Sequence, residues 1–259
     1  MPEITIGGNR INYIEGDAID PGRPTVLMIH GAGQRVSTWK RQLEILKNHP
    51  KYNLIIPDLP GHGASEGEGL RDIAGYEGFI EEFAGALGLG DIIPVGHSMG
   101  GAVAMVYALD NPQKVRASVL VGTGARMRVA GETLKTVKNN YLLFCDVAPS
   151  RMIAPGSSEE IRKEFREGLR DTSPDVCYWD LVACDEFDLM DRVHQINKPT
   201  CVVSAELDIL TPPKYGEHLR DFIYGSSYHL INAAGHFMML EQPAEFNRIL
   251  SGFLMSLDS

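Results

Sequence analysis

The sequence predicts an α/β fold, in which helices flank a mostly parallel β-sheet and one helical segment is inserted into the chain. Three observations support this prediction. Short apolar runs rich in β-branched residues recur along the chain, and each is followed by a loop that contains glycine or proline. Helix-favouring stretches separate these runs. The alternation stops between residues 122 and 197, where the chain is charged and lacks strand-like runs.

The strand-like runs follow a definite order. Residues 4–6 and 11–15 are joined by Gly-Gly-Asn-Arg at residues 7–10, which suits a tight hairpin and predicts an antiparallel edge. Parallel strands buried on both faces are then expected at residues 26–29, 53–56, 92–95, 117–121 and 200–204. A further strand-like run covers residues 227–231.

Helices are expected between these strands, at residues 39–47, 72–87, 99–109, 215–222 and 243–257. Inside the inserted segment, three stretches favour helix, at residues 134–144, 158–169 and 176–193. We therefore divide the chain into a core and a cap. The core is expected to comprise residues 1–122 and 197–259, and the helical cap residues 123–196.

Length and composition limit the class of protein. A chain of 259 residues, 44% of them hydrophobic, suits one compact domain or one domain with a sizeable insertion. The net charge of -10, spread without long runs, argues against a nucleic-acid partner. Residues 1–17 lack the features of a secretory signal, and apolar stretches such as 102–109 are far shorter than a membrane span. We expect a cytoplasmic protein with no membrane partner, whose oligomeric state the sequence leaves open.

The cysteines do not predict a metal site or a disulfide framework. They show no C-x-x-C spacing, and none is separated from a histidine by an interval typical of metal ligands. The four cysteines are Cys145, Cys177, Cys184 and Cys201. We expect free and mostly buried thiols.

A motif typical of serine nucleophiles lies between a predicted strand and a predicted helix. Gly-His-Ser-Met-Gly at residues 96–100 stands between a predicted strand and a predicted helix, as G-x-S-x-G demands. Small residues are needed on both sides of so sharp a turn, and Gly96 and Gly100 supply them. The turn also directs the N–H of Met99 beside Ser98 Oγ, where the helix dipole favours negative charge. Ser98 is the candidate nucleophile, although this pattern alone suits a helix cap equally well.

Two glycine-containing loops follow earlier strands. His-Gly-Ala-Gly at residues 30–33 is expected to bring an N–H toward the nucleophile, and Ala32 is the candidate second oxyanion donor. His30 is interpreted as a structural hydrogen-bonding residue. The loop at residues 58–65 is interpreted as scaffold, with Asp58 as an alternative acid and His62 as an alternative substrate contact.

Serine catalysis also needs an imidazole to accept the proton and a carboxylate to orient that imidazole. Of the eight histidines, only His236 occupies a loop after the last predicted strand, where Gly235 frees the backbone. Asp208 follows the strand at residues 200–204 and is expected at the same edge of the sheet. Glu206, two residues earlier, competes for this role. An acid could also reach the histidine from the loop just after the strand at residues 117–121. Residues 122–124 of that loop are Gly-Thr-Gly and offer no carboxylate.

Taken together and in this order, these motifs resemble the α/β-hydrolase superfamily over essentially the whole chain, and more narrowly its lidded esterases, lactonases and C–C hydrolases. The matching segments are residues 30–33, 58–65 and 96–101, the Asp208 loop, and Gly235-His236 with Glu241-x-Pro243 after it. The resemblance implies an α/β-hydrolase fold with an eight-stranded, mostly parallel sheet, a helical cap after the sixth strand, and neither metal nor organic cofactor. Ser98 argues against the family's dehalogenases and epoxide hydrolases, which use aspartate as nucleophile.

The sequence therefore predicts a carboxylesterase-like serine hydrolase that cleaves an ester or related acyl bond of a small molecule, through Ser98, His236 and Asp208. C–C bond, lactone or thioester hydrolysis, cyanohydrin cleavage, and a slow or non-catalytic binding or signalling role remain alternatives. C–C hydrolases usually carry Gly-Asn-Ser at the elbow, where this chain has Gly-His-Ser. Four aromatic residues of the cap are candidates for lining a substrate pocket, although aromatics at helical spacing are more often core: Phe144, Phe165, Tyr178 and Trp179. Of these, Phe144, Tyr178 and Trp179 are the candidate substrate contacts.

Overall fold

A twisted sheet of eight strands forms the centre of the molecule, in the order β1-β2-β4-β3-β5-β6-β7-β8. The computed structural model describes residues 2–257. The first two strands pair antiparallel with each other, and β2 pairs antiparallel with β4, whereas every pairing from β4 to β8 is parallel. The strands are β1 (Glu3–Ile6), β2 (Asn9–Glu15), β3 (Thr25–Ile29), β4 (Asn53–Pro57), β5 (Ile92–His97), β6 (Ser118–Val121), β7 (Thr200–Ala205) and β8 (Ser227–Ile231).

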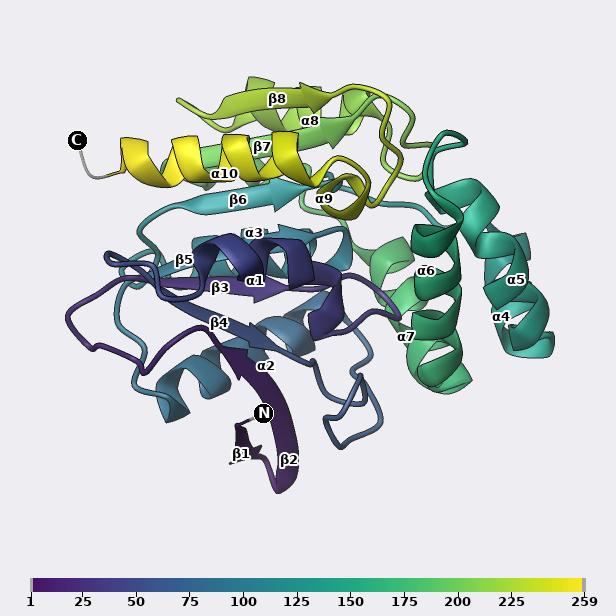
Figure 1. The fold of residues 1–259 in the computed structure, drawn as a ribbon, viewed down its shortest axis with the longest axis horizontal. Coiled ribbons are helices and arrows are strands. Elements are labelled where there is room, and N and C mark those ends of the chain that lie inside the picture. The colour runs from purple at the N-terminus through teal and green to yellow at the C-terminus, as the bar shows by residue number, and fades with distance from the viewer. Residues whose placement is uncertain (1, 258–259) are drawn as a thin grey trace.

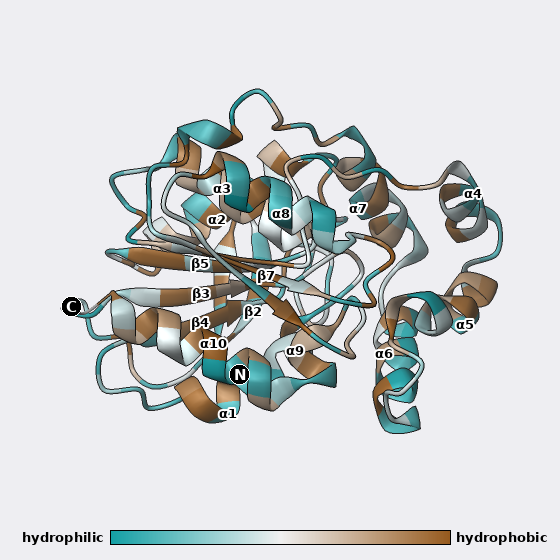
Figure 2. Ribbon diagram, turned by 90° about the horizontal axis from the view of Figure 1, so that it is seen from above, coloured by the Kyte–Doolittle hydropathy of each residue, from teal (hydrophilic) through white to brown (hydrophobic). Residues whose placement is uncertain are grey.

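Helices cover both faces of this sheet (Figures 1 and 2). One face carries α1 (Lys40–Leu46), α9 (Met238–Glu241) and α10 (Pro243–Ser256). The opposite face carries α2 (Ile73–Ala86), α3 (Met99–Asp110) and α8 (Pro213–Phe222). Since both faces are covered, all residues of β3 and β4 are buried, which explains their continuous apolar sequence.

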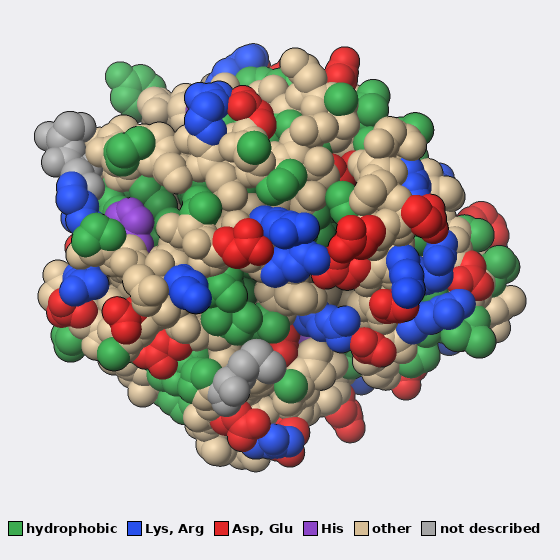
Figure 3. All heavy atoms as spheres, viewed as in Figure 1, with side chains coloured by type: hydrophobic (Ala, Val, Ile, Leu, Met, Phe, Trp, Pro, Cys, Tyr) green, Lys and Arg blue, Asp and Glu red, His purple; other side chains and the backbone are tan. Residues whose placement is uncertain are grey.

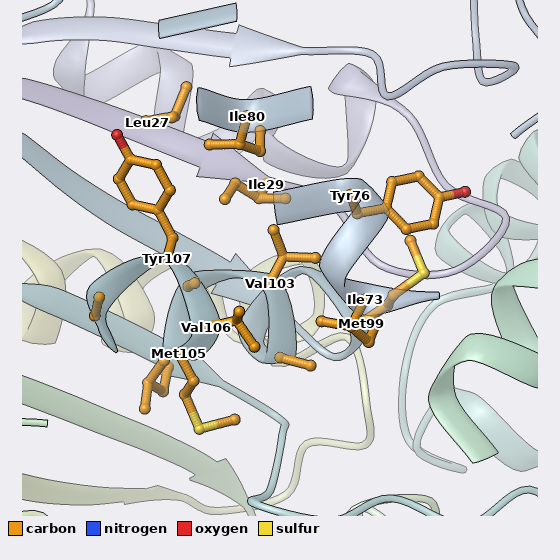
Figure 4. Packing of buried hydrophobic residues seen from close by; sticks show 14 of the residues in the cluster. Leu27, Ile29, Ile73, Tyr76, Ile80, Met99, Val103, Met105, Val106 and Tyr107 are labelled. Carbon is orange, nitrogen blue, oxygen red and sulfur yellow. The ribbon is translucent and has the colours of Figure 1, made fainter. Parts of the chain in front are cut away.

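The core on the α2–α3 side shows how the elbow helix is fixed. Val103 of α3, Ile29 of β3 and Ile80 of α2 belong to one buried cluster, and Met99 lies at the start of α3 close to Ile73 (Figure 4). These side chains are fully or almost fully buried. The start of α3, directly after the candidate nucleophile, is therefore rigidly attached to the sheet.

Four helices separate β6 from β7 in the sequence and lie beyond the carboxyl ends of the parallel strands (Figure 1). They are α4 (Gly131–Asn139), α5 (Tyr141–Met152), α6 (Glu159–Asp171) and α7 (Pro174–Glu186). Two short 3-10 helices, η1 (Val36–Trp39) and η2 (Val193–Gln195), complete the described elements. We refer to α4–α7 and their connections as the insertion.

The predicted fold class is confirmed, because the sheet has eight strands and is mostly parallel. The helix expected at residues 134–144 is two helices, since Asn140 stands between α4 and α5 and its side chain accepts a hydrogen bond from Leu143 N (3.2 Å) to cap α5. The helix expected at residues 176–193 ends at Glu186, because the backbone becomes extended at Phe187 and Asp188 then bridges to Arg126. The division of the chain at residues 123 and 196 stays a prediction.

Candidate active site

Ser98 sits on a strained turn between β5 and α3, with φ 53° and ψ -116°. A positive φ is costly for a residue with a side chain, so neighbouring contacts must hold it. The two flanking glycines leave no room for a side chain. A Cβ on Gly96 would lie 2.1 Å from the carbonyl oxygen of Gly100, and one on Gly100 would lie 2.3 Å from that of Ile29. The turn is therefore possible only with glycine at both positions.

The candidate base and acid are directly hydrogen-bonded. His236 Nδ1 lies 2.7 Å from Asp208 Oδ2, and both side chains are buried. Asp208 Oδ1 accepts from the N–H groups of Leu210 (2.9 Å) and Thr211 (3.0 Å), and the Thr211 hydroxyl donates to Oδ2 (2.8 Å). Because an ionised carboxylate only accepts hydrogen bonds, His236 Nδ1 carries the proton and Nε2 is left able to accept one.

The charge on Asp208 is stabilised by the same contacts. Burial alone would raise the pKa of this carboxyl, but attraction to His236 and hydrogen bonds from His236 and Thr211 outweigh burial and hold the pKa below its ordinary value. Asp208 is therefore ionised at neutral pH. The competing acid, Glu206, is exposed and its carboxylate accepts from Ala233 N (2.9 Å).

A carboxylate that we did not predict as a site residue holds the loop of the base. Glu241 accepts from the N–H groups of Gly235 (3.1 Å) and Phe237 (3.0 Å), which flank His236 on both sides. It also accepts from Ala154 N of the insertion (2.8 Å). In the sequence, Glu241 contributes only to the resemblance, and its spacing of five residues from His236 is the signal that could have revealed this role.

The loop of the candidate oxyanion donor is oriented by a neutral histidine. Leu59 N donates to His30 Nε2 (3.0 Å), so His30 Nδ1 carries the proton and donates to Gly31 O (2.9 Å). Burial lowers the pKa of His30 well below its ordinary value. Gly31 O also accepts from Gln34 N (3.2 Å). A trans peptide directs its C=O and N–H in opposite directions, so these bonds orient the Ala32 N–H of the same peptide unit.

This loop packs directly on the nucleophile turn. A Cβ on Gly31 would lie 3.2 Å from Ser98 Cβ and 3.2 Å from the carbonyl oxygen of His97. Met99, the other candidate donor, is the first residue of α3 and is fully buried. The glycine at position 31 thus permits the close approach of the two loops.

A cavity of about 320 Å³ lies between the core and the insertion. Ser98, His236 and Ala32 line it together. The rest of the lining is mostly apolar and includes Phe144, Val147, Ala148, Phe165, Leu169, Leu181, Ile209, Leu210 and Phe237. The structure therefore brings residues from four separate loops of the core to one apolar chamber.

Two of the predicted cap aromatics, Tyr178 and Trp179, do not line the cavity. Helix α7 presents one face to the cavity, formed by Cys177, Leu181 and Cys184. Tyr178 and Trp179 follow Cys177 and point elsewhere. The Trp179 ring lies 3.8 Å from the guanidinium of Arg71, and the Tyr178 ring lies 5.4 Å from the ammonium of Lys138. Of the four predicted aromatic residues, Phe144 and Phe165 line the cavity.

The carboxylate of Asp58, the alternative acid, is engaged in hydrogen bonds that hold the surrounding loop. Its Oδ1 accepts from Val36 N (2.7 Å), and its Oδ2 accepts from Asn12 Nδ2 (2.7 Å) and Ala64 N (3.0 Å). Gly63 passes so close that a Cβ there would lie 2.3 Å from this carboxylate. Asp58 holds the loop at residues 58–65 against β2 and η1.

The four cysteines are free and buried. Burial raises the pKa of Cys177 and Cys184, which therefore stay protonated at neutral pH although they line the cavity. Within residues 2–257, no group of three or more His, Cys, Asp or Glu side chains is arranged to hold a metal ion.

Comparison with known proteins identifies the family. The model of the Alpha/beta hydrolase family matches residues 26–249. The chain belongs to this family. Among curated relatives, pyrrolizixenacetamide deacetylase of Xenorhabdus hominickii is 26% identical, covering 100% of this α/β-hydrolase and 99% of the relative. The 2-hydroxy-6-oxo-2,4-heptadienoate hydrolase of Pseudomonas putida is 25% identical, with 98% and 96% of the two chains covered.

Solved structures agree with this assignment. A thermophilic esterase is 33% identical to this α/β-hydrolase, with a TM-score of 0.85 and coverage of 99% and 97% of the two chains. The enol-lactonase from Burkholderia xenovorans has a TM-score of 0.91 at 22% identity, over 98% of this chain and 100% of its own, and so shows the shared fold. The chain is thus a member of a family of hydrolases.

The surface of this α/β-hydrolase mixes both signs of charge. On the face shown in Figure 3, Lys and Arg side chains lie among Asp and Glu side chains and not in one basic patch. No helix within residues 2–257 is long and apolar enough to cross a membrane.

A buried ion pair joins the core of this α/β-hydrolase to α7. His62 Nε2 lies 2.7 Å from Asp180 Oδ2, and both side chains are fully buried. Burial alone would lower the pKa of His62, but the Asp180 carboxylate outweighs burial and raises it above the ordinary value. His62, the alternative substrate contact, is thus bonded to the insertion.

This ion pair predicts a pH-dependent stability. Because the folded pKa of His62 is raised, its stabilising contribution is fully present below about pH 6.5 and is lost as the pH rises through the folded pKa. We expect the free energy of unfolding of His62→Gln, measured in urea, to fall less than that of the wild type between about pH 6 and about pH 9. An equal fall in both proteins would contradict this assignment.

Proposed function

We propose that the chain is a serine hydrolase that cleaves a carboxylic ester, or a related acyl bond, in a small molecule with an apolar acyl group. The observation that carries the proposal is the hydrogen bond of 2.7 Å between His236 and Asp208, on the wall of the same apolar cavity as Ser98. The family membership and the similarity to an esterase at 33% identity support it. In this proposal, residues 123–196 form the cap that covers the acyl group.

In the proposed mechanism, Ser98 Oγ attacks the carbonyl carbon while His236 Nε2 takes its proton. The N–H groups of Met99 and Ala32 donate to the oxyanion, and ionised Asp208 stabilises the imidazolium. When the bond to the leaving group breaks, the leaving group takes the proton from Nε2 and the acyl group stays on Oγ. Water then attacks the acyl carbon and gives a proton to His236, which returns it to Oγ as the acid leaves.

Labelling with a fluorophosphonate tests the proposal, because these reagents modify activated serines. We expect one phosphonyl group per chain, on the peptide that carries Ser98, together with turnover of p-nitrophenyl esters. The heat-denatured protein is the control and should not react. Absence of modification would contradict an activated Ser98, and modification without ester turnover would point to another acyl bond or to a non-catalytic role.

The apolar cavity predicts a preference for apolar acyl chains. Each buried methylene contributes about 0.8 kcal/mol, so kcat/KM should rise about fourfold per added methylene until the cavity is full. Initial rates on p-nitrophenyl esters of graded chain length measure this. Ala148→Phe, which adds volume to the wall, should move the optimum to shorter chains. A flat profile in both proteins would contradict the assignment of the cavity to the acyl group.

Two comparisons favour a second candidate function, the hydrolysis of a C–C bond. Relatives at 25% identity are hydrolases of 2-hydroxy-6-oxo-2,4-heptadienoate and of 2-hydroxymuconate semialdehyde, and both compounds carry a carboxylate. Arg151 of α5 lines the cavity and would attract such a group. Faster turnover of these compounds than of esters, with a large increase in KM in Arg151→Ala, would favour this alternative.

A further inference from the structure

Gly33 follows the candidate oxyanion donor Ala32 directly and is held by the insertion on both sides of its backbone. Its N–H donates to Asp180 Oδ2 of α7 (2.8 Å). Its carbonyl oxygen accepts from the hydroxyl of Thr172, which lies between α6 and α7 (3.1 Å). Both polar groups of a core residue next to the reacting atoms are therefore bonded to the insertion.

The insertion also encloses Gly33 sterically. The residue has φ +65°, which favours glycine, and a Cβ there would lie 3.2 Å from Leu169 Cδ2 and 3.3 Å from Cys177 Sγ. Leu169 and Cys177 are themselves buried. The loop thus has little freedom to move while α6 and α7 stay in place.

Asp180 is fixed independently of Gly33. It is fully buried, and its carboxylate also accepts from His62 Nε2 (2.7 Å) and from the Tyr76 hydroxyl. A buried carboxylate with this many partners has one stable position, because moving it would leave charge and donors unpaired. It therefore anchors Gly33 at a defined place relative to the core.

The anchoring acts on Ala32 through peptide geometry. The peptide before Ala32 is oriented by the bonds to Gly31 O, and the peptide after Ala32 contains the Gly33 N–H that Asp180 holds. With both planes fixed, neither backbone torsion of Ala32 is free to turn. Thr172 holds the next peptide, through Gly33 O, and so keeps Gly33 from turning. We infer that Asp180 and Thr172 are positioning residues for the oxyanion hole, and that the insertion acts on catalysis as well as on substrate selection.

This inference rests on the proposed function, in which the Ala32 N–H stabilises the oxyanion. Loss of one oxyanion donor typically lowers kcat by about 10²–10³-fold, and displacement of a donor should cost less. The effect should fall on kcat and leave KM nearly unchanged, because the contact is made in the transition state.

Thr172 offers the cleaner variants, since valine keeps its shape and serine keeps its hydroxyl. We expect Thr172→Val to lower kcat for a p-nitrophenyl ester about tenfold with KM within about twofold, and Thr172→Ser to restore most of the activity. Asp180→Asn should lose more, about 10–100-fold in kcat, because the carboxylate accepts from Gly33 and His62 at Oδ2 and from Tyr76 at Oδ1, and the single carbonyl oxygen of asparagine cannot serve both sides. Glu164→Gln is the control, since it breaks an ion pair between α6 and Lys40 that involves none of residues 30–33.

Two further measurements separate positioning from general damage. A trifluoromethyl ketone forms an oxyanion adduct with the serine, so its inhibition constant should rise by the same factor as kcat/KM falls in Thr172→Val. Hydrogen exchange of the peptide around residues 30–36 should be faster in this variant than in Glu164→Gln.

Each outcome decides between the two proposals. If the wild type is phosphonylated at Ser98 but Thr172→Val and Asp180→Asn keep normal kcat and inhibitor affinity, the inference is wrong and the proposed function stands. The inference is also wrong if Thr172→Ser is as impaired as Thr172→Val. If the wild type is neither phosphonylated nor able to turn over an ester, both proposals fail together.

Discussion

Replacing Ser98 with alanine should lower kcat for ester hydrolysis by about 10⁶-fold, the loss typical when the nucleophile of a serine triad is removed. Without Oγ no acyl-enzyme forms, and His236 and the oxyanion donors remain to assist only direct attack by water. Initial rates on a p-nitrophenyl ester, corrected for trace wild-type enzyme by active-site titration, measure this loss.

Folding should be unaffected by Ser98→Ala. Alanine keeps the Cβ, and the positive φ of 53° at this position is imposed by the turn and not by the hydroxyl. The thermal midpoint should therefore stay close to that of the wild type. Ser150→Ala, at an exposed serine on α5, is the matched control and should keep full activity. Near-normal hydrolysis by Ser98→Ala would overturn the proposed function.

Asp208→Asn should lower kcat by about 10⁴-fold while the protein stays folded. Asparagine can turn its NH₂ group toward His236 Nδ1, which then becomes an acceptor and shifts the ring proton to Nε2. An imidazole protonated at Nε2 cannot take the proton of Ser98. The same ester assay, together with the rate of phosphonylation, measures the loss.

Glu206→Gln is the matched control for Asp208→Asn, because it makes the same chemical change two residues earlier. The Glu206 carboxylate accepts from Ala233 N at the exposed edge, so we expect kcat to change by less than about fivefold. A larger loss in Glu206→Gln than in Asp208→Asn would reverse the assignment of the acid.

Much of the fold was predictable because its determinants are local. Strands β3 to β7 are fully buried, so their apolar runs are continuous. At residues 96 and 100 the elbow has room only for glycine. The choice between Asp208 and Glu206 is different, since it depends on which carboxylate meets the N–H groups of Leu210 and Thr211. That geometry belongs to the folded loop.

The insertion was less predictable for a related reason. Buried residues occur at many positions around α7, so its sequence does not reveal which face meets the cavity, and Tyr178 and Trp179 do not line it. The Asp180 contacts join segments separated by 104 to 147 residues, and no local pattern marks them. These contacts form only when α7 packs on the core, so they cannot be predicted from the sequence.

The loop that carries His236 is bonded to the insertion, and this limits how the insertion can be engineered. His236 N donates to Met152 O at the end of α5, and Glu241 reaches Ala154 and Ser157 just beyond it. Exchanging the whole insertion for that of a relative would therefore disturb the imidazole together with the cavity proposed to hold the acyl group. Mutant libraries that aim to change selectivity are best confined to the cavity face of α5, at Phe144, Val147 and Ala148, with residues 152–157 left as nature has them.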